Sequence, residues 1–128
     1  NRDAFWIAHE GEDKVHVHPI EPGVHLISHN DLDTGLRAET HLARAREGVP
    51  EGAMDDPESW ERWVALLSER AEPDSEYWEA ALNVDVPDWG FGTVSSAMIA
   101  LPSMHDEGAK PVFMFADGPG DQATYKPV

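Results

Sequence analysis

The stretch that decides the fold class is Lys14-Val15-His16-Val17-His18-Pro19-Ile20, in which apolar and polar side chains alternate. Residues two apart on a strand point to the same side of a sheet, so Val15 and Val17 would share one face and His16 and His18 the other. Strands are also expected over residues 3–9 and 24–28, joined to this one by polar turns at Glu10–Asp13 and Glu21–Gly23. The three strands predict an antiparallel meander.

The middle of the chain changes to a helical period. Apolar residues recur at helical spacing over 36–46, with Thr34 as the N-cap and Gly48-Val49-Pro50 as the stop. Asp56-Pro57-Glu58 is a strong start for a second helix, because a capping aspartate is followed by proline at the first helical position. A third, shorter helix is expected over 73–82. The apolar face of the second helix would consist of Trp60, Trp63, Val64 and Leu67.

Strands return in the last third of the chain. Extended segments are predicted over 93–101, 112–116 and 123–127, with a polar loop over 104–110. Antiparallel sheets before and after a run of helices indicate an α+β fold. Residues 1–128 have the length of a single domain. Six strands and three helices leave so little spare core that a missing partner layer is credible.

The composition excludes several partners. The chain has 25 acidic and 9 basic residues and a formal net charge of −16, so a nucleic-acid backbone would be repelled. No run of ~20 apolar residues exists to span a membrane, and we expect a cytoplasmic location. The absence of Cys removes thiolate metal sites and a cysteine nucleophile from this chain. Because no Met begins it, we expect it to be processed, a fragment or part of a longer protein.

Seven histidines raise the question of a metal site. His16 and His18 are ligand-capable on one strand face, and Glu21 and His25 follow, but we interpret all four as the polar side of a hairpin. We therefore expect no metal and no other cofactor. A serine triad could be composed in two ways, but no Gly-x-Ser-x-Gly elbow accompanies either, so a self-contained serine hydrolase is not predicted. The two sets are Ser28, His29 and Asp31, and Ser95, His105 and Asp106.

Two segments carry more polar or small residues than a connecting loop requires. Residues 22–33 lead from a strand into the polar cluster Ser28–Asp31, and residues 89–96 surround the Thr93 hydroxyl with small residues. Each has a structural interpretation: a side-chain cap on the next turn in the first, and close backbone approach between packed sheets in the second. Each also has a functional one, because loops at strand ends commonly carry binding groups.

Together these segments resemble the latter half of the NRDE family, also called the transport and Golgi organisation family. The resemblance covers most of the chain, in order. It implies a fold like that of N-terminal nucleophile hydrolases, a four-layer αββα sandwich of which residues 1–128 would be the C-terminal half. The tracts that carry it are Phe5–His9, Pro22–Ser28, Arg37–Glu39, Gly90–Ser96, Met98–Leu101 and Phe113–Pro119.

The resemblance also implies a chemistry. Such hydrolases use a Cys at the mature N-terminus, with its own amine as the base, to cleave non-peptide C–N bonds. That Cys would lie upstream of this chain, in another part of the same protein. His29, Asn30 and Thr93 would line the pocket for a small-molecule substrate, and His29 or Asn30 would help to bind the oxyanion. Both stay candidates, because many members have Ser-Asn where this chain has Ser28-His29-Asn30.

The resemblance leaves open how active the protein is. Family members often carry Thr-Arg where this chain has Thr93-Val94, so a natural partner for a carboxylate is missing. The alternative is a non-catalytic carrier or trafficking factor, since members of the family have been linked to haem handling and to Golgi or secretory organisation. In that case His25 and His29 would serve a haem.

Overall fold

The computed structural model describes residues 3–9, 11, 14–51, 56–71, 75–103, 105 and 108–128. Of the sequence predictions, most of the turn at Glu10–Asp13, the start of the third helix at Pro73-Asp74, and Asp106 of one composed triad lie outside these residues. The described parts contain two α-helices, three 3₁₀ turns and strands in three antiparallel sheets.

The predicted N-terminal hairpin is confirmed. Strand β1 (Ala4–Ala8) pairs antiparallel with β2 (His16–Ile20), and Trp6 lies opposite His18. The alternation puts His16 and His18 on one face, where the ring of His18 stacks on Trp6 with centroids 5.0 Å apart. The other face carries exposed apolar side chains, namely Phe5, Ile7 and Val17.

The predicted third strand over 24–28 is wrong, because this segment has no sheet partner and forms an irregular loop. The reason lies in Leu26, whose two backbone groups bond to Asp33 within the same loop. Its N–H donates to Oδ1 of Asp33 at 2.8 Å, and its carbonyl accepts from the Asp33 N–H at 2.9 Å. These groups are therefore not free to extend the sheet beside β2.

Helix α1 (Gly35–Glu47) forms where the spacing predicts it. Thr34 occupies the N-cap position, but its hydroxyl makes no capping bond and donates instead to the Asp31 carbonyl at 2.9 Å. Ala38 and His41 are buried on the inner face of the helix. The helix ends at Gly48, whose N–H donates to the Arg44 carbonyl.

The second helix starts as predicted. Asp56 accepts a hydrogen bond at 3.0 Å from the backbone of Glu58, within the 3₁₀ turn η1 (Pro57–Trp60), and helix α2 (Glu61–Ser68) follows. Trp60 and Leu66 are buried, and the indole of Trp63 donates to the Ala45 carbonyl at 3.1 Å. This bond joins α2 to α1.

The predicted third helix is reduced to the 3₁₀ turn η2 (Trp78–Ala80). After it the backbone of Ala81 is extended. Side chains of α1 take the carbonyls here: Arg37 donates to Ala81 at 3.0 Å, and His41 donates to Ala80 at 2.8 Å. Because these carbonyls bond to another element, the turn does not continue into a helix.

Two very short strands were not predicted. Strand β3 (Asp85–Val86) pairs antiparallel with β4 (Phe91–Gly92) around the 3₁₀ turn η3 (Pro87–Trp89). Trp78 packs edge-on against Trp89 and Phe91, with ring centroids 5.6 and 6.2 Å apart. Two paired residues are too few to produce a period in the sequence.

The C-terminal strands are confirmed, with shorter ends than predicted. Strands β5 (Ser96–Ala100), β6 (Val112–Ala116) and β7 (Lys126–Pro127) form one antiparallel sheet in that order. Met98 and Ala116 are buried. Side chains on the opposite face are exposed, as the alternation along the strands requires.

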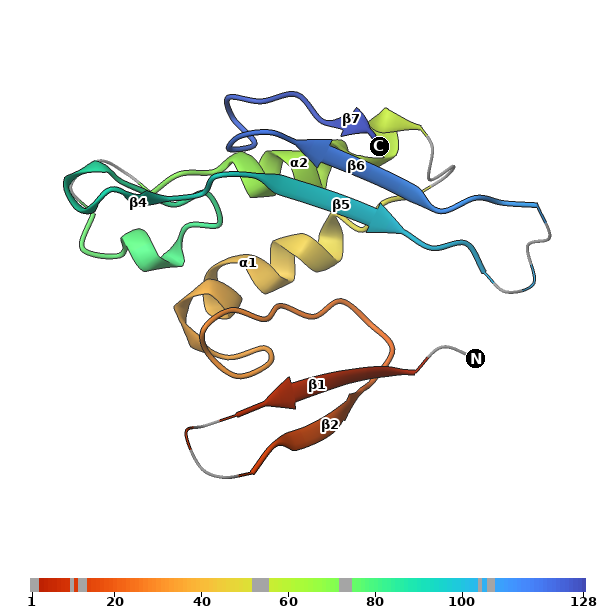
Figure 1. Cartoon of the computed structure of the whole chain (residues 1–128), viewed down its shortest axis with the longest axis horizontal. Coiled ribbons are helices and arrows are strands. Elements are labelled where there is room, and N and C mark those ends of the chain that lie inside the picture. Colours follow the sequence, from red (N-terminus) through yellow and green to blue (C-terminus); the bar gives the residue numbers. More distant parts are fainter. Residues whose placement is uncertain are drawn as a thin grey trace.

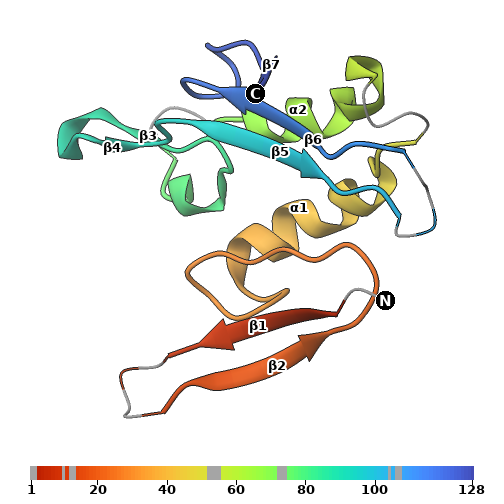
Figure 2. The same ribbon diagram turned by 45° about the vertical axis from the view of Figure 1, so that its right-hand side comes forward.

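Figures 1 and 2 show how these elements lie in space. Helix α1 runs between the β1–β2 hairpin on one side and the β5–β6–β7 sheet on the other, and α2 lies on the same side of that sheet as α1. The fold is therefore α+β, with small antiparallel sheets and two helices, as predicted at that level. Neither helix in the described ranges is long and apolar enough to cross a membrane.

Candidate functional site

The loop between β2 and α1 carries two of the predicted site residues, His29 and Asn30, and both are exposed. The Asn30 N–H donates to the Ser28 hydroxyl at 3.3 Å. Its side chain covers the start of α1 so closely that a Cβ on Gly35 would lie 2.6 Å from the Asn30 Cγ. Gly35 has a φ of 78°, in the left-handed region that favours glycine. His29 and Asn30 are thus exposed to solvent in a loop that packs closely against the start of α1.

Thr93, the third predicted site residue, is part of the pairing around β3. Its hydroxyl accepts from the Val84 N–H at 3.0 Å, and its own N–H donates to the Val84 carbonyl at 2.8 Å. The hydroxyl of Thr93 therefore fastens one backbone segment to another, which agrees with the structural interpretation of close backbone approach.

The structure keeps Thr93 apart from the loop that carries His29 and Asn30. In Figures 1 and 2 the loop over 21–34 runs between the hairpin and α1, whereas the segment from β4 to β5 lies on the other side of α1. The three residues do not converge on one pocket within this chain.

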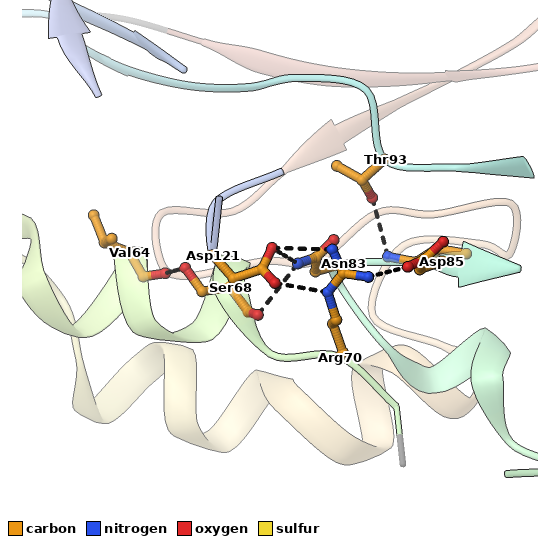
Figure 3. Close-up of polar contacts among 8 residues, drawn as sticks. Val64, Ser68, Arg70, Asn83, Asp85, Thr93 and Asp121 are labelled. Atoms are coloured by element: carbon orange, nitrogen blue, oxygen red, sulfur yellow. Dashed lines mark hydrogen bonds and ion pairs between the residues drawn. The ribbon is translucent and has the colours of Figure 1, made fainter. Parts of the chain in front are cut away.

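A polar network that the sequence did not reveal lies next to Thr93 (Figure 3). Arg70 follows α2 and donates from Nε to Asp121 at 2.7 Å, while its Nη1 bonds to Asp85 and its Nη2 reaches Asp121 at 3.3 Å. Two bonds raise the pKa of Arg70 above its ordinary value, the bond to Asp121 more than the bond to Asp85. In return Arg70 lowers the pKa of Asp121.

Asn83 is the buried centre of this network, with an exposed fraction of 1%. Its Nδ2 donates to Asp121 at 2.6 Å and to the Ser68 carbonyl at 3.3 Å, while its Oδ1 has no partner among the described residues. Gly120 fits closely here, since a Cβ on it would lie 2.9 Å from the Ser68 hydroxyl oxygen. All three guanidinium nitrogens of Arg70 are engaged, so the network fixes the chain rather than offering a free cation to a substrate.

A cleft of about 450 Å³, which Arg70 also lines, opens between α1 and the segment leading to η2. His41 lines the cleft and is 4% exposed. Its Nε2 donates to the Ala80 carbonyl, and its Nδ1 has no partner among the described residues. Arg44 and Glu69 form a two-bond ion pair at the rim, and this pair lowers the pKa of Glu69. The size suits a small molecule, and polar groups over apolar walls are usual in such sites.

The other chemistry weighed from the sequence can also be placed. Both ring nitrogens of His25 are engaged, with Asp33 at 2.7 Å and with the Glu21 carbonyl at 2.8 Å, so His25 could ligate a haem only by losing one of these bonds. In the described ranges no three His, Asp or Glu residues gather as a metal site would require. Ser28 accepts from Asn30, so its oxygen has a role in the turn.

Sequence periodicity could not have revealed Arg70, Asn83 and Asp121, because Arg70 and Asp121 are 51 residues apart. Comparison of the chain with family models, curated proteins and solved structures gave no match. Membership of the NRDE family therefore stays a prediction that rests on the tracts quoted above.

Proposed function

We propose that this chain is the supporting half of an NRDE-type, N-terminal nucleophile amidohydrolase-like protein. A Cys-bearing half of the same protein would lie upstream, and the two halves would form a four-layer αββα sandwich. The reaction would cleave a non-peptide C–N bond of a small molecule, with the Cys thiolate as nucleophile and its own amine as base. It needs no cofactor, and a cytoplasmic location belongs to the proposal.

The observation that carries the proposal is the apolar outer face of the β5–β6 sheet. Ile99 lies opposite Phe113 in the register, and Ala97 lies opposite Phe115, so all four side chains share one face. Ile99 is 61% exposed, Phe113 39% and Phe115 37%. The reverse face of the sheet includes the buried residues Met98 and Ala116.

An apolar sheet face of this kind is typical of an interface. The β5–β6–β7 sheet has helices on one side and an uncovered apolar face on the other. This arrangement supports the proposal that a second sheet packs face to face against it, as in an αββα sandwich. A second copy is a poor cover, because the formal charge of −16 makes two copies repel each other. The sheet of an upstream half fits better.

Within this proposal His29, Asn30 and Thr93 supply polar groups to the completed site. The exposed Asn30 amide and His29 imidazole can donate N–H groups to a developing oxyanion. Thr93 follows β4 on the side of α1 where the β5–β6–β7 sheet lies, whereas the loop with His29 and Asn30 lies on the opposite side of α1. His29 and Asn30 would therefore reach the reaction only through a surface that the upstream half completes. The catalytic role of all three is part of the proposal.

Single cysteine substitutions test whether an upstream half covers the outer face of the β5–β6 sheet, because this chain contains no cysteine of its own. Ile99→Cys is placed in the native protein and in the 128-residue chain made alone, and alkylation is followed by peptide mapping. We expect rapid labelling in the chain alone and strong protection in the native protein. Val49→Cys, at a 42% exposed site after α1, is the matched control and should label equally in both. Equal labelling of Ile99→Cys in both would overturn the proposal.

The activity is tested on the native protein after its intact mass and N-terminal sequence are determined. Hydrolysis of a panel of non-peptide amides that is abolished when an N-terminal Cys is replaced by Ala supports the enzyme. A native chain that starts at Asn1 removes the nucleophile, and the prediction of a non-catalytic carrier or trafficking factor then takes its place. A spectral shift on adding haem, lost in His29→Ala, would support that carrier.

A further inference from the structure

The loop between β2 and α1 is held by a histidine whose two ring nitrogens both meet acceptors. His25 Nδ1 lies 2.7 Å from Oδ2 of Asp33, and Nε2 lies 2.8 Å from the backbone carbonyl oxygen of Glu21. An ionised carboxylate and a carbonyl accept hydrogen bonds and cannot donate them. Both ring nitrogens must therefore carry a proton for both bonds to exist. An imidazole with two N–H groups is the positively charged form.

Asp33 is committed to the same loop as an ionised acceptor. Its Oδ1 accepts from the Leu26 N–H at 2.8 Å, and its own N–H donates to the Leu26 carbonyl at 2.9 Å. Its φ of 59° is in the left-handed region, which aspartate and asparagine tolerate better than most residues. The side chains of His25 and Asp33 are 24% and 26% exposed, so both are partly screened from water. Asp33 thus holds the end of the loop, and His25 ties it back to Glu21 at the start.

We propose that His25, Asp33 and the Glu21 carbonyl form a pH-sensitive clamp, which closes the loop over 21–33 when His25 is protonated and releases the Glu21 end when it is not. A neutral imidazole has one N–H. Asp33 retains it at Nδ1, because a hydrogen bond to a carboxylate is stronger than one to a neutral carbonyl. The lone pair of Nε2 then faces the carbonyl oxygen of Glu21, and two acceptors at 2.8 Å repel each other.

The charged groups around His25 set the pH range of the clamp. The bond to Asp33, then the bond to Glu21, raises the pKa of His25 above its ordinary 6.5, and the positive charge of Arg46 on α1 opposes this. The Leu26 N–H, then His25, lowers the pKa of Asp33 below its ordinary 3.8.

The contribution of His25 is therefore complete below pH 6.5 and is lost as the pH rises through its higher folded-state pKa. The contribution of Asp33 is complete above pH 3.8 and is lost as the pH falls through its lower folded-state pKa. The clamp is fully closed between these two values. The inference concerns the loop itself and does not rest on the proposed function, although His29 and Asn30 lie within the closed segment.

Asp33→Asn gives a sharp test. The amide oxygen of asparagine can still accept from Leu26, and its NH₂ can donate to Nδ1 of a neutral His25, which leaves Nε2–H for the Glu21 carbonyl. The variant is thus expected to keep the loop closed without a charge on His25. His29→Gln is the matched control, since it removes a neighbouring imidazole and none of the clamp atoms.

The measurement is an NMR titration of the native protein. In the unsubstituted protein and in His29→Gln, we expect the His25 ring to titrate above pH 6.5 and the backbone amides of residues 22–26 to shift with the same midpoint. In Asp33→Asn the titration midpoint of the His25 ring should fall by about one pH unit or more. The backbone amides of residues 22–26 should then no longer shift when the ring titrates. Equal midpoints in the unsubstituted protein and Asp33→Asn would overturn the clamp.

A second readout needs no substitution. The ¹⁵N shifts of the His25 ring should report two protonated nitrogens at pH 6 and a single protonated nitrogen, Nδ1, above the midpoint. A protonated Nε2 above the midpoint, or amides of 22–26 that do not move when the ring titrates, would also overturn the proposal.

Discussion

Replacing Asn83 tests whether a buried amide holds Arg70 and Asp121 in place. In Asn83→Ala two hydrogen bonds disappear: the 2.6 Å bond to the Asp121 carboxylate and the 3.3 Å bond to the Ser68 carbonyl. The Oδ1 atom of Asn83 has no partner among the described residues, and a buried acceptor without a partner destabilises the native state. Because Asn83→Ala removes this atom as well, part of the loss is offset.

The magnitude follows from these opposing terms. A hydrogen bond to a charged group contributes about 1.5–3 kcal/mol and a neutral one about 0.5–1.5 kcal/mol, while removal of a buried unpaired acceptor returns about 1–3 kcal/mol. The shorter side chain also leaves a small cavity, which adds to the destabilisation. Taken together, these effects should make Asn83→Ala lower the free energy of unfolding by about 2 kcal/mol. Asn83→Asp keeps the shape but turns a carboxylate oxygen toward Asp121, so we expect a loss of about 4 kcal/mol.

Urea unfolding followed by tryptophan fluorescence measures these losses, because Trp60 is buried in the native state. Asp85→Asn is the control: its carboxylate also bonds to Arg70, but its side chain is 48% exposed, so the expected loss is below about 1 kcal/mol. The reasoning is refuted if Asn83→Asp is no less stable than Asn83→Ala, since the amide would then not be facing the Asp121 carboxylate.

Further predictions concern the loop, the acid limit, the sheet and a cap. Gly35→Ala should cost about 1–3 kcal/mol, because its φ is 78° and a Cβ would collide with Asn30; Asn30→Ala in the same chain should restore part of the melting temperature. Arg70 lowers the pKa of Asp121 below its ordinary value of 3.8. The stability due to Asp121 is therefore present above pH 3.8 and is lost as the pH falls through the lower pKa of the folded state. In Asp121→Asn the free energy of unfolding should depend less on pH in that range. Met98→Ala should cost about 2–5 kcal/mol in the 128-residue chain and Ile99→Ala under about 1 kcal/mol, and similar losses for both would contradict the assignment of the two sheet faces. Asp56→Ala should cost about 1 kcal/mol through loss of the cap on Glu58, with Glu51→Ala as an exposed control that leaves the urea midpoint unchanged.

Local signals in the sequence predicted much of the fold. Alternation placed the β1–β2 hairpin, helical spacing placed α1, the Asp56-Pro57 start placed η1 and α2, and the apolar run over 112–116 placed β6. In each case neighbouring residues determine the structure, because the period or the cap is contained in a few consecutive positions.

Side-chain bonds within a loop and contacts between distant residues decided what the sequence did not predict. Residues 24–28 have the composition of a strand, but the bonds between Leu26 and Asp33 and the ion pair of His25 hold them in a loop. The structure shows His29 and Asn30 exposed in a loop, and their role in a site stays a prediction. The rest depends on how α2, β3 and the chain before β7 pack together. This packing determines both the position of Thr93 and the Arg70–Asn83–Asp121 network, and it leaves no periodic pattern in the sequence.

The hairpin has a consequence for local unfolding. Within the described residues β1 and β2 pack extensively only with each other, and the loop over 21–34 leads from them to α1. A two-stranded hairpin is marginally stable in water, so its opening should cost far less than global unfolding. Amide hydrogen exchange is therefore expected to separate the chain into a rapidly exchanging unit at Trp6 and Val17 and a slowly exchanging unit at Met98 and Ala116.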